Sequence, residues 1–546
     1  MSEFNNKTDV IIIGGGLTGH IAAYELTKNN INVCLLKCGL GASPGVSGFN
    51  IPNVEKDDSV NRFIEDTIVS GRGQGANELV DTLCNGTTKI EKYLEDIGFE
   101  FDHNSDGSLK ARKSLGSSYA RVVGHGNGSG SQILKLLIGK LNANKYFSTL
   151  EQVRALRLIT KNNKACGVYA YDIRNKQFVT LYGKAILLCT GGFAGIFPFT
   201  SNSKDISGDG AALALQAGCN LVDTEFVQFE PSSAVWPLAI RGKGMITTLF
   251  YEGAIMKNGK GERFMLKYGD KAECVNKDVL SKAIEKEIMA GNATEHGGIW
   301  FDASGVDKNR LHDAYQPFID RYAEVGIDLT SEPVELANAA HTALGGVEID
   351  KDCRTAIKGL YCGGEAAGHL HGANRIGGSA GSETLVFGQI AAKSIINDIS
   401  NYELIDDIEY TNTSEKYFDL SSKQLDEYKN KMKELLGKSA GVYRNATDLK
   451  NSYELLSLMY NEVFYSKDSD NTEYMYKKYQ LENDLLVTRS IILAALTRED
   501  SCGCHQRIDY QIDPKTNYHT SIKYINNDIC VSKINNETGE EEKCQK

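Results

Sequence analysis

Residues 9–37 read "DVIIIGGGLTGHIAAYELTKNNINVCLLK", and this stretch decides the fold. Its apolar run Val10–Ile13 is typical of a buried parallel strand, and a second run follows at Val33–Leu36. Between them, G-x-G-x-x-G spacing allows a tight turn, close approach to a pyrophosphate and packing of a helix on the strand. We therefore predict a dinucleotide site built by Gly14, Gly15, Gly16, Leu17, Thr18 and Gly19 at a helix N-terminus.

One position departs from this fingerprint. An acidic residue normally ends the second strand and holds the ribose hydroxyls, but Lys37 stands there. Two interpretations stay open. Lys37 contacts a phosphate of the cofactor, or it points to solvent while the adenosine is held by backbone and by later residues.

Glycine-rich strand ends recur far along the chain. The first is "GKAILLCTGGFAG" (183–195). The second, "GDGAALALQAG" (208–218), is predicted to be a turn that presents Asp209, followed by a helix with small residues on one face. The third is "GLYCGGEAAGHLHGANRIGGSAGSETLVFGQ" (359–389), in which a helix is expected from near Ser382. Because a large, extended cofactor has to be bound at several strand ends of one sheet, these three segments indicate such a cofactor. The last segment also places Glu365, His369, His371 and Arg375 among residues that are nearly free of other charge.

Composition excludes several classes. A chain of 546 residues is long enough for two to four domains. Its net charge of −11, without a basic cluster, argues against a nucleic-acid partner. No apolar run approaches the roughly 20 residues of a membrane helix, and "MSEFNNKTDV" lacks the features of a signal peptide. The thirteen cysteines are scattered singly, which favours reduced thiols and a cytoplasmic protein without direct membrane insertion.

The motifs carry a family resemblance. "GGGLTG", "CTGGF", "SGDG", "DTEFVQFEP", "GERFM", "HTALGG", "GLYCGGEAAG" and "HGANRIGGSAGSETLVFGQIA" occur in the order seen in flavoprotein subunits of the fumarate reductase/succinate dehydrogenase family. L-aspartate oxidase and the adenylylsulfate reductase flavoprotein belong to the same superfamily. The similarity extends to about residue 525 and implies FAD as the cofactor.

The resemblance implies roles for individual residues. Glu365 would bind a ribose or ribityl hydroxyl, and backbone N–H groups near Ala380 and Gly381 would stabilise the reduced flavin. Arg375 would clamp a substrate carboxylate, with His341 of "HTALGG" and His371 beside it. In "GASPGVSGF" (41–49), Ser43 and Gly48 would contact FAD. That stretch lacks the histidine that attaches FAD covalently in the family, so non-covalent binding is expected.

Three departures from the family surround the substrate. Glu230 replaces a histidine, Thr247 and Phe250 fall near the places of a relay acid and arginine, and Lys277 takes the place of the proton-donating arginine. Lys277 can still donate a proton. Glu230 would repel a second substrate carboxylate, bind a substrate amine, or form a structural pair with Lys277. Together these changes argue against fumarate and succinate.

The motifs that the sequence lacks indicate where the electrons for the flavin would come from or go to. No second G-x-G-x-x-G opens a nicotinamide domain, and no cysteine array suits an iron–sulfur cluster. Electrons would therefore pass to or from a diffusible carrier, oxygen, a second substrate, or a separate partner such as an iron–sulfur protein. The C-x-C of Cys502 and Cys504 has no second cysteine pair, so buried thiols are expected there rather than a metal.

The predicted architecture is α/β. A Rossmann-like FAD-binding domain is formed by residues 1–230 and 347–405, interrupted by an α+β capping domain at 231–346 whose hairpin lies at 253–265. A helical C-terminal domain spans 406–515, and 516–546 forms a C-terminal tail, of which the acidic end "INNETGEEEKCQK" (534–546) is expected to be solvated. The predicted activity is hydride transfer between flavin N5 and a small carboxylate-bearing substrate. The rivals are an amino-acid or amine oxidase of the L-aspartate oxidase kind and an electron-transfer flavoprotein without its own substrate.

Overall fold

The computed structural model describes residues 6–126, 128–245, 247–408, 410, 416–510 and 517–543. The first five residues and the end of the expected tail, 544–546, lie outside these ranges.

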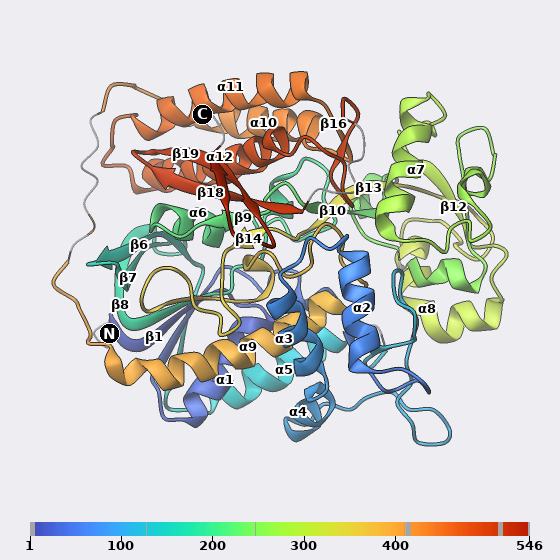
Figure 1. Ribbon diagram of the computed structural model, residues 1–546, viewed down its shortest axis with the longest axis horizontal. Coiled ribbons are helices and arrows are strands. Elements are labelled where there is room, and N and C mark those ends of the chain that lie inside the picture. Colours follow the sequence, from blue (N-terminus) through green and yellow to red (C-terminus); the bar gives the residue numbers. More distant parts are fainter. Residues whose placement is uncertain are drawn as a thin grey trace.

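A seven-stranded sheet forms the centre of the FAD-binding region (Figure 1). Its parallel part has the order β5 (Phe147–Glu151), β2 (Val33–Lys37), β1 (Lys7–Ile13) and β8 (Gln177–Leu188), and β15 (Leu360–Cys362) also pairs with β8. Two antiparallel strands, β7 (Lys164–Asp172) and β6 (Val153–Lys161), extend it beyond β8. The late glycine-rich segment therefore returns to the sheet that the N-terminal segment begins.

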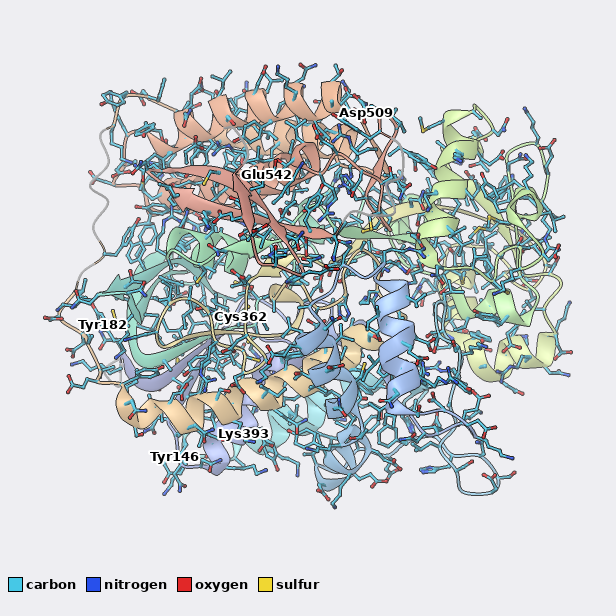
Figure 2. All side chains as sticks on the ribbon, in the orientation of Figure 1. Tyr146, Tyr182, Cys362, Lys393, Asp509 and Glu542 are labelled. Atoms are coloured by element: carbon cyan, nitrogen blue, oxygen red, sulfur yellow. The ribbon has the colours of Figure 1, made fainter. Side chains whose placement is uncertain are left out.

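Alternate side chains of β1 serve two different cores. Val10 and Ile12 pack with the helices α1 (Leu17–Lys28), α5 (Ser129–Asn142) and α9 (Ser379–Asp398), which lie on one side of the sheet (Figure 1). Ile11 and Ile13 join the core shared with the C-terminal helices. This is why the run is apolar without interruption. Cys362, at the end of β15, is fully buried in the middle of the fold (Figure 2).

A second α+β unit lies at one end of the molecule, where the capping domain is predicted (Figure 1). Its sheet has the order β10 (Val227–Ala234), β13 (Val334–Ala343), β12 (Ile299–Asp302) and β11 (Ile255–Lys257), accompanied by α7 (Lys277–Met289) and α8 (Lys308–Ala323). The hairpin predicted at 253–265 is not formed. β11 pairs instead with β12, because the chain after Asn258 closes a tight turn onto Glu262 and continues without a second strand.

The C-terminal region combines helices and strands. The helices are α10 (Ser422–Ser439), α11 (Ala446–Phe464) and α12 (Thr472–Thr497). Where a C-terminal tail was predicted, β18 (Tyr518–Ile525), β19 (Asp528–Asn535) and β20 (Glu541–Lys543) form a sheet with β9 (Leu221–Val222) and β14 (Gly346–Val347). The β18–β19 turn places Asn526 and Asn527 at positive φ, which suits a two-residue hairpin, and burial of Ile522 and Val531 holds the strands.

Helices in the described part of the chain do not combine the length and apolar character needed to cross a membrane.

Candidate functional site

A cleft of about 970 Å³ opens at the carboxyl ends of the parallel strands. This is the position at which open α/β sheets bind ligands. The sequence-predicted residues that line it are Gly14, Gly15, Gly16, Leu17, Thr18, Lys37, Ser43, Asp209, Glu365 and Ala380.

The glycine turn after β1 shapes the cleft. Gly14 has φ +127°, and a Cβ on Gly15 would lie 2.5 Å from the carbonyl oxygen of Gly39. Gly16 precedes α1 and has no side chain to cap it, while the N–H of Leu17 donates to Ser43 Oγ at 2.9 Å. Side chains are thus excluded from the space in front of a helix N-terminus, and this cradle fits the pyrophosphate of a dinucleotide.

Three predicted cofactor residues lie behind the cleft rather than on it. A Cβ on Gly19 would meet the carbonyl oxygen of Gly14 at 2.2 Å, so Gly19 lets the helix pack on the turn. Gly48 and Gly381 face each other, since a Cβ on Gly381 would lie 2.7 Å from the Gly48 oxygen. Gly48 and Gly381 therefore let two segments of the chain approach closely behind the wall of the cleft.

Charged groups meet at the far end of the cleft. Lys37 Nζ lies 3.1 Å from Glu151 Oε1 at the end of the neighbouring β5. Asp209 begins α6 (Asp209–Gln216), and its Oδ2 lies 3.3 Å from Arg154 Nε. Arg154, on β6, also donates from Nη2 to the Asp205 carbonyl oxygen at 3.0 Å. Sequence reasoning missed Arg154, because a single arginine on an edge strand carries no motif.

Glu365 provides a half-buried acceptor on the wall of the cleft. Its Oε1 accepts a hydrogen bond from the N–H of Ala343 at 3.0 Å. Burial raises the pKa of this carboxyl to about 7. Ala380 and Thr384 line the same wall at the start of α9, which begins at Ser379 rather than near Ser382, because Gly378 turns the chain at φ +88°. A hydroxyl-rich cofactor presenting donors to Glu365 suits this wall.

A second cluster is formed by side chains of β10, β13 and α7 and by Arg375, which precedes α9. Glu230, on β10, accepts a hydrogen bond from Lys277 Nζ at the start of α7, and Ser232 Oγ lies 2.7 Å from Glu230 Oε1. Both charged side chains are buried. Burial raises the pKa of Glu230, but Lys277, His341 and Ser232 outweigh it, so the pKa lies below its ordinary value. The pairing of Glu230 with Lys277, one of three alternatives from the sequence, is confirmed.

His341 and Arg375 complete this cluster. His341 Nδ1 lies 2.9 Å from Ser201 Oγ, and its Nε2 lies 3.9 Å from Glu230 Oε2. The surrounding protein and then the charge of Lys277 lower the pKa of His341 to about 3, so the imidazole is neutral. Arg375 donates from Nη1 to the Ile376 carbonyl oxygen at 3.0 Å, and its buried Nε has no hydrogen-bond partner among the described residues.

His371 pairs with a carboxylate of α9, and its role in substrate binding stays a prediction. It is buried, and its Nε2 lies 3.0 Å from Glu383 Oε2 on α9. Glu383 in turn acts on Arg375, whose pKa is lowered by burial and raised by this carboxylate. His371 is thus directed to a carboxylate of α9 that also acts on Arg375.

The places of the family's relay contain no charge. Phe250 is buried and packs against Phe301, and Thr247 begins a short 3-10 segment. A contact that sequence reasoning missed joins Arg72 to Asp278, next to Lys277, with Nη2 to Oδ2 at 2.8 Å. No pattern signals it, because the partners are remote in sequence and belong to different domains.

The cysteines of the described ranges form no disulfide bond. All twelve cysteines in the described ranges are free, and burial raises the pKa of Cys502 to about 12 and raises that of Cys504 further. Within those ranges, no group of three or more histidine, cysteine or acidic residues is arranged to hold a metal ion.

Two family models match this chain. A FAD binding domain model matches residues 9–380, and a fumarate reductase flavoprotein C-terminal model matches residues 429–538. One relative, a component of the CoM/CoB fumarate reductase of Methanothermobacter marburgensis, is 31% identical over 523 residues, covering 92% of this chain and 94% of its own. L-aspartate oxidase of Yersinia pestis is 28% identical over 532 residues, covering 93% and 97%.

Among solved structures, FrdA of E. coli quinol fumarate reductase, determined as a variant, has a TM-score of 0.87 at 22% identity over 96% of both chains. The shared fold and the family models confirm the resemblance inferred from the motifs.

Proposed function

This chain belongs to the flavoprotein family of fumarate reductases and succinate dehydrogenases, and we propose that it acts on a small carboxylate-bearing substrate other than fumarate. It is a FAD-dependent oxidoreductase. The observation that carries the proposal is the pair of Glu230 and Lys277 beside Arg375, because it joins a cationic carboxylate clamp to a proton donor that already has an anionic partner.

FAD supplies two-electron chemistry when bound, giving or accepting a hydride at N5. Gly14–Leu17 would hold its pyrophosphate, Glu365 a hydroxyl, and the start of α9 the flavin ring. The stretch 41–49, which contains Ser43, has no histidine that could bond covalently to FAD. This supports non-covalent binding of FAD.

Arg375 is suited to bind the substrate carboxylate. Its buried Nε is unpartnered among the described residues, and a planar anion would supply the missing acceptor. The neutral imidazole of His341 would hydrogen-bond another part of the substrate without adding charge. Because Glu230, Lys277 and His341 come from strands and a helix of the capping unit, the substrate would bridge the two domains and be shielded from water.

Lys277 is suited to transfer a proton. In the reducing direction, a hydride adds to one alkene carbon of an enoate and the proton from Lys277 Nζ adds to the other, so two electrons and two hydrogen nuclei saturate the C=C bond. Lys277 then regains a proton through Glu230 and Ser232. The two electrons come from a soluble carrier or from an electron-transfer partner such as an iron–sulfur protein.

An amine oxidase function is the second candidate, and the relationship to L-aspartate oxidase favours it. It would need Glu230 for a substrate amine. Because Lys277 already occupies that carboxylate, the reductase or dehydrogenase function is better supported.

The test is anaerobic reduction of bound FAD by saturated acids and amino acids, and stopped-flow reoxidation by enoates, amino-acid-derived imines or oxygen. We expect reoxidation by an enoate, with fumarate below about 10 per second. Faster reaction of fumarate than of every other compound would contradict the substrate assignment. Reaction with oxygen alone, after reduction by an amino acid, would favour the oxidase.

A further inference from the structure

A short segment, residues 199–202, lies alongside β13 at His341. The N–H of Ser201 donates to the Ala340 carbonyl oxygen at 3.0 Å, and Asn202 Nδ2 donates to the His341 carbonyl oxygen at 2.8 Å. These two contacts grip the backbone of β13 on both sides of the peptide that leads into His341. They hold the hydroxyl oxygen of Ser201 2.9 Å from His341 Nδ1, which is hydrogen-bonding distance.

The neighbouring acceptors decide the direction of this hydrogen bond. The Ala340 carbonyl oxygen has two lone pairs, and it already accepts from the N–H of Ser201 at 3.0 Å and from Thr200 Oγ1 at 2.8 Å. Ser201 Oγ lies 3.5 Å from that oxygen, which is long for a hydroxyl donor. Among the described residues, His341 Nδ1 is therefore the better acceptor for the Ser201 hydroxyl. The hydroxyl donates, and Nδ1 carries no proton.

The single proton of the His341 ring then lies on Nε2. The pKa of His341 is lowered to about 3, first by the surrounding protein and then by the charge of Lys277. Arg375 adds to this effect and Glu230 opposes it, so the ring is a neutral imidazole. The hydrogen bond at one ring nitrogen sets the proton on the other. Nε2 lies 3.9 Å from Glu230 Oε2, an oxygen that only accepts when ionised, which agrees with an N–H on this side.

We infer that Ser201 is a positioning residue that holds His341 as its Nε2–H tautomer, so that the site presents a hydrogen-bond donor to an oxygen acceptor of the substrate. The inference rests on the proposed function, which places His341 at the substrate. It extends that function, because the substrate then carries an acceptor in addition to the carboxylate bound by Arg375. An ammonium group only donates and would not match this N–H.

The tautomer is measured directly by ¹⁵N NMR of the oxidised holoenzyme labelled in its histidines, with His341→Gln identifying the ring signals. We expect a protonated Nε2 and an unprotonated Nδ1 in the wild-type protein and in Ser201→Thr, which keeps the hydroxyl. Ser201→Ala should show a mixture of both tautomers, because a water molecule at Nδ1 can donate or accept. A protonated Nδ1 in the wild-type protein would overturn the inference, and so would an unchanged tautomer in Ser201→Ala.

Two ligands of equal charge and similar shape test the consequence for the substrate. Levulinate has a ketone oxygen, and its analogue has a methylidene group in the same place; both are titrated into the oxidised holoenzyme by flavin absorbance. We expect the wild-type protein and Ser201→Thr to bind levulinate at least about tenfold more tightly than the analogue. Ser201→Ala should reduce this ratio at least about fivefold.

Ser304→Ala is the matched control. Ser304 is an exposed residue of the capping unit, and its hydroxyl donates to Asp302 Oδ1 at 2.6 Å. This variant should keep the wild-type ratio. Equal binding of the two ligands by the wild-type protein would overturn the assignment of an acceptor to the substrate. If neither ligand binds, the carboxylate site of the proposed function fails and this assignment fails with it, while the NMR measurement still decides the role of Ser201.

Discussion

Arg375 shows how much a single buried side chain contributes to this site. Its Nε lacks a partner among the described residues, and burial lowers its pKa. An anionic ligand is the natural acceptor, because an unpaired buried donor is unfavourable. Alanine at this position would remove the contact entirely, whereas the FAD cleft is lined by other residues.

We therefore expect Arg375→Ala to retain FAD but to lower kcat/KM for the carboxylate substrate by at least about 30-fold. Carboxylate ligands should also cease to perturb the flavin spectrum. Arg375→Lys keeps the charge without the fork, so it should recover binding only in part. Stopped-flow reoxidation and ligand difference spectra measure both effects, and turnover equal to wild type in the alanine variant would refute the assignment.

Glu365 predicts a pH dependence. Its pKa is raised by burial from 4.5 to about 7. Below 4.5 the carboxyl is protonated in both folded and unfolded chains. Between these values the unfolded chain ionises first, so the folded state loses stability as pH rises, and the loss levels off above about 7.

The cofactor-free wild-type protein should thus lose Tm relative to Glu365→Gln as the pH rises from 4.5 to about 7. Thermal unfolding of both proteins across this range measures the difference. A constant difference in Tm over the range would show that Glu365 titrates normally.

At the scale of elements, a contact between two domains positions the proton donor. Arg72 follows α2 (Val60–Ser70) in the FAD-binding domain, and its side chain pairs with Asp278 in the first turn of α7, directly after Lys277. Arg72 has φ +58°, a left-handed conformation that is unfavourable for a residue with a side chain. The fold retains this strain where it connects the domains.

We expect Arg72→Ala to lower kcat about five- to tenfold with little change in FAD content, because α7 loses the contact that fixes Lys277. Arg62→Ala is the matched control, since Arg62 lies on the exposed surface of α2 and pairs with Glu65 on the same helix. Steady-state kinetics of both variants give the comparison. Equal kcat in the two variants would argue against a positioning role.

At the scale of the whole molecule, the C-terminal strands are part of the core. On β18, Ile522 is fully buried, whereas Ile525 is 51% exposed. Ile522→Ala should lower the free energy of unfolding by about 2–5 kcal/mol, and Ile525→Ala should change it by no more than about 0.5 kcal/mol. Equilibrium denaturation distinguishes this from a solvated tail, in which both changes would be small.

The state of the cofactor is also a property of the whole molecule, since residues from several strands surround it. Without a histidine in the stretch 41–49, purified protein should be yellow and release all its flavin on acid precipitation. Flavin fluorescence that stays with the denatured polypeptide on a gel would show a covalent bond.

Sequence patterns predicted the local elements well where backbone geometry demands a residue type. Glycine is required after β1 because a Cβ there would collide with neighbouring atoms, as a Cβ on Gly15 would with the carbonyl oxygen of Gly39. The C-terminal hairpin also left a signal, the pair Asn526 and Asn527, but the surrounding acidic residues suggested a tail. Two details were predicted wrongly, the residue at which α9 begins and the strand with which β11 pairs. Both depend on turns that amino-acid composition does not reveal.

The sequence by itself determined the cofactor fold, the family and the positions at which the substrate site departs from it, because these follow from short motifs with strict local geometry. Only the tertiary structure paired Glu230 with Lys277, joined Arg72 to Asp278 and directed His371 to Glu383. The physical reason is that these are contacts between remote segments. Their energies depend on distance, burial and neighbouring charge, which exist only after the chain has folded.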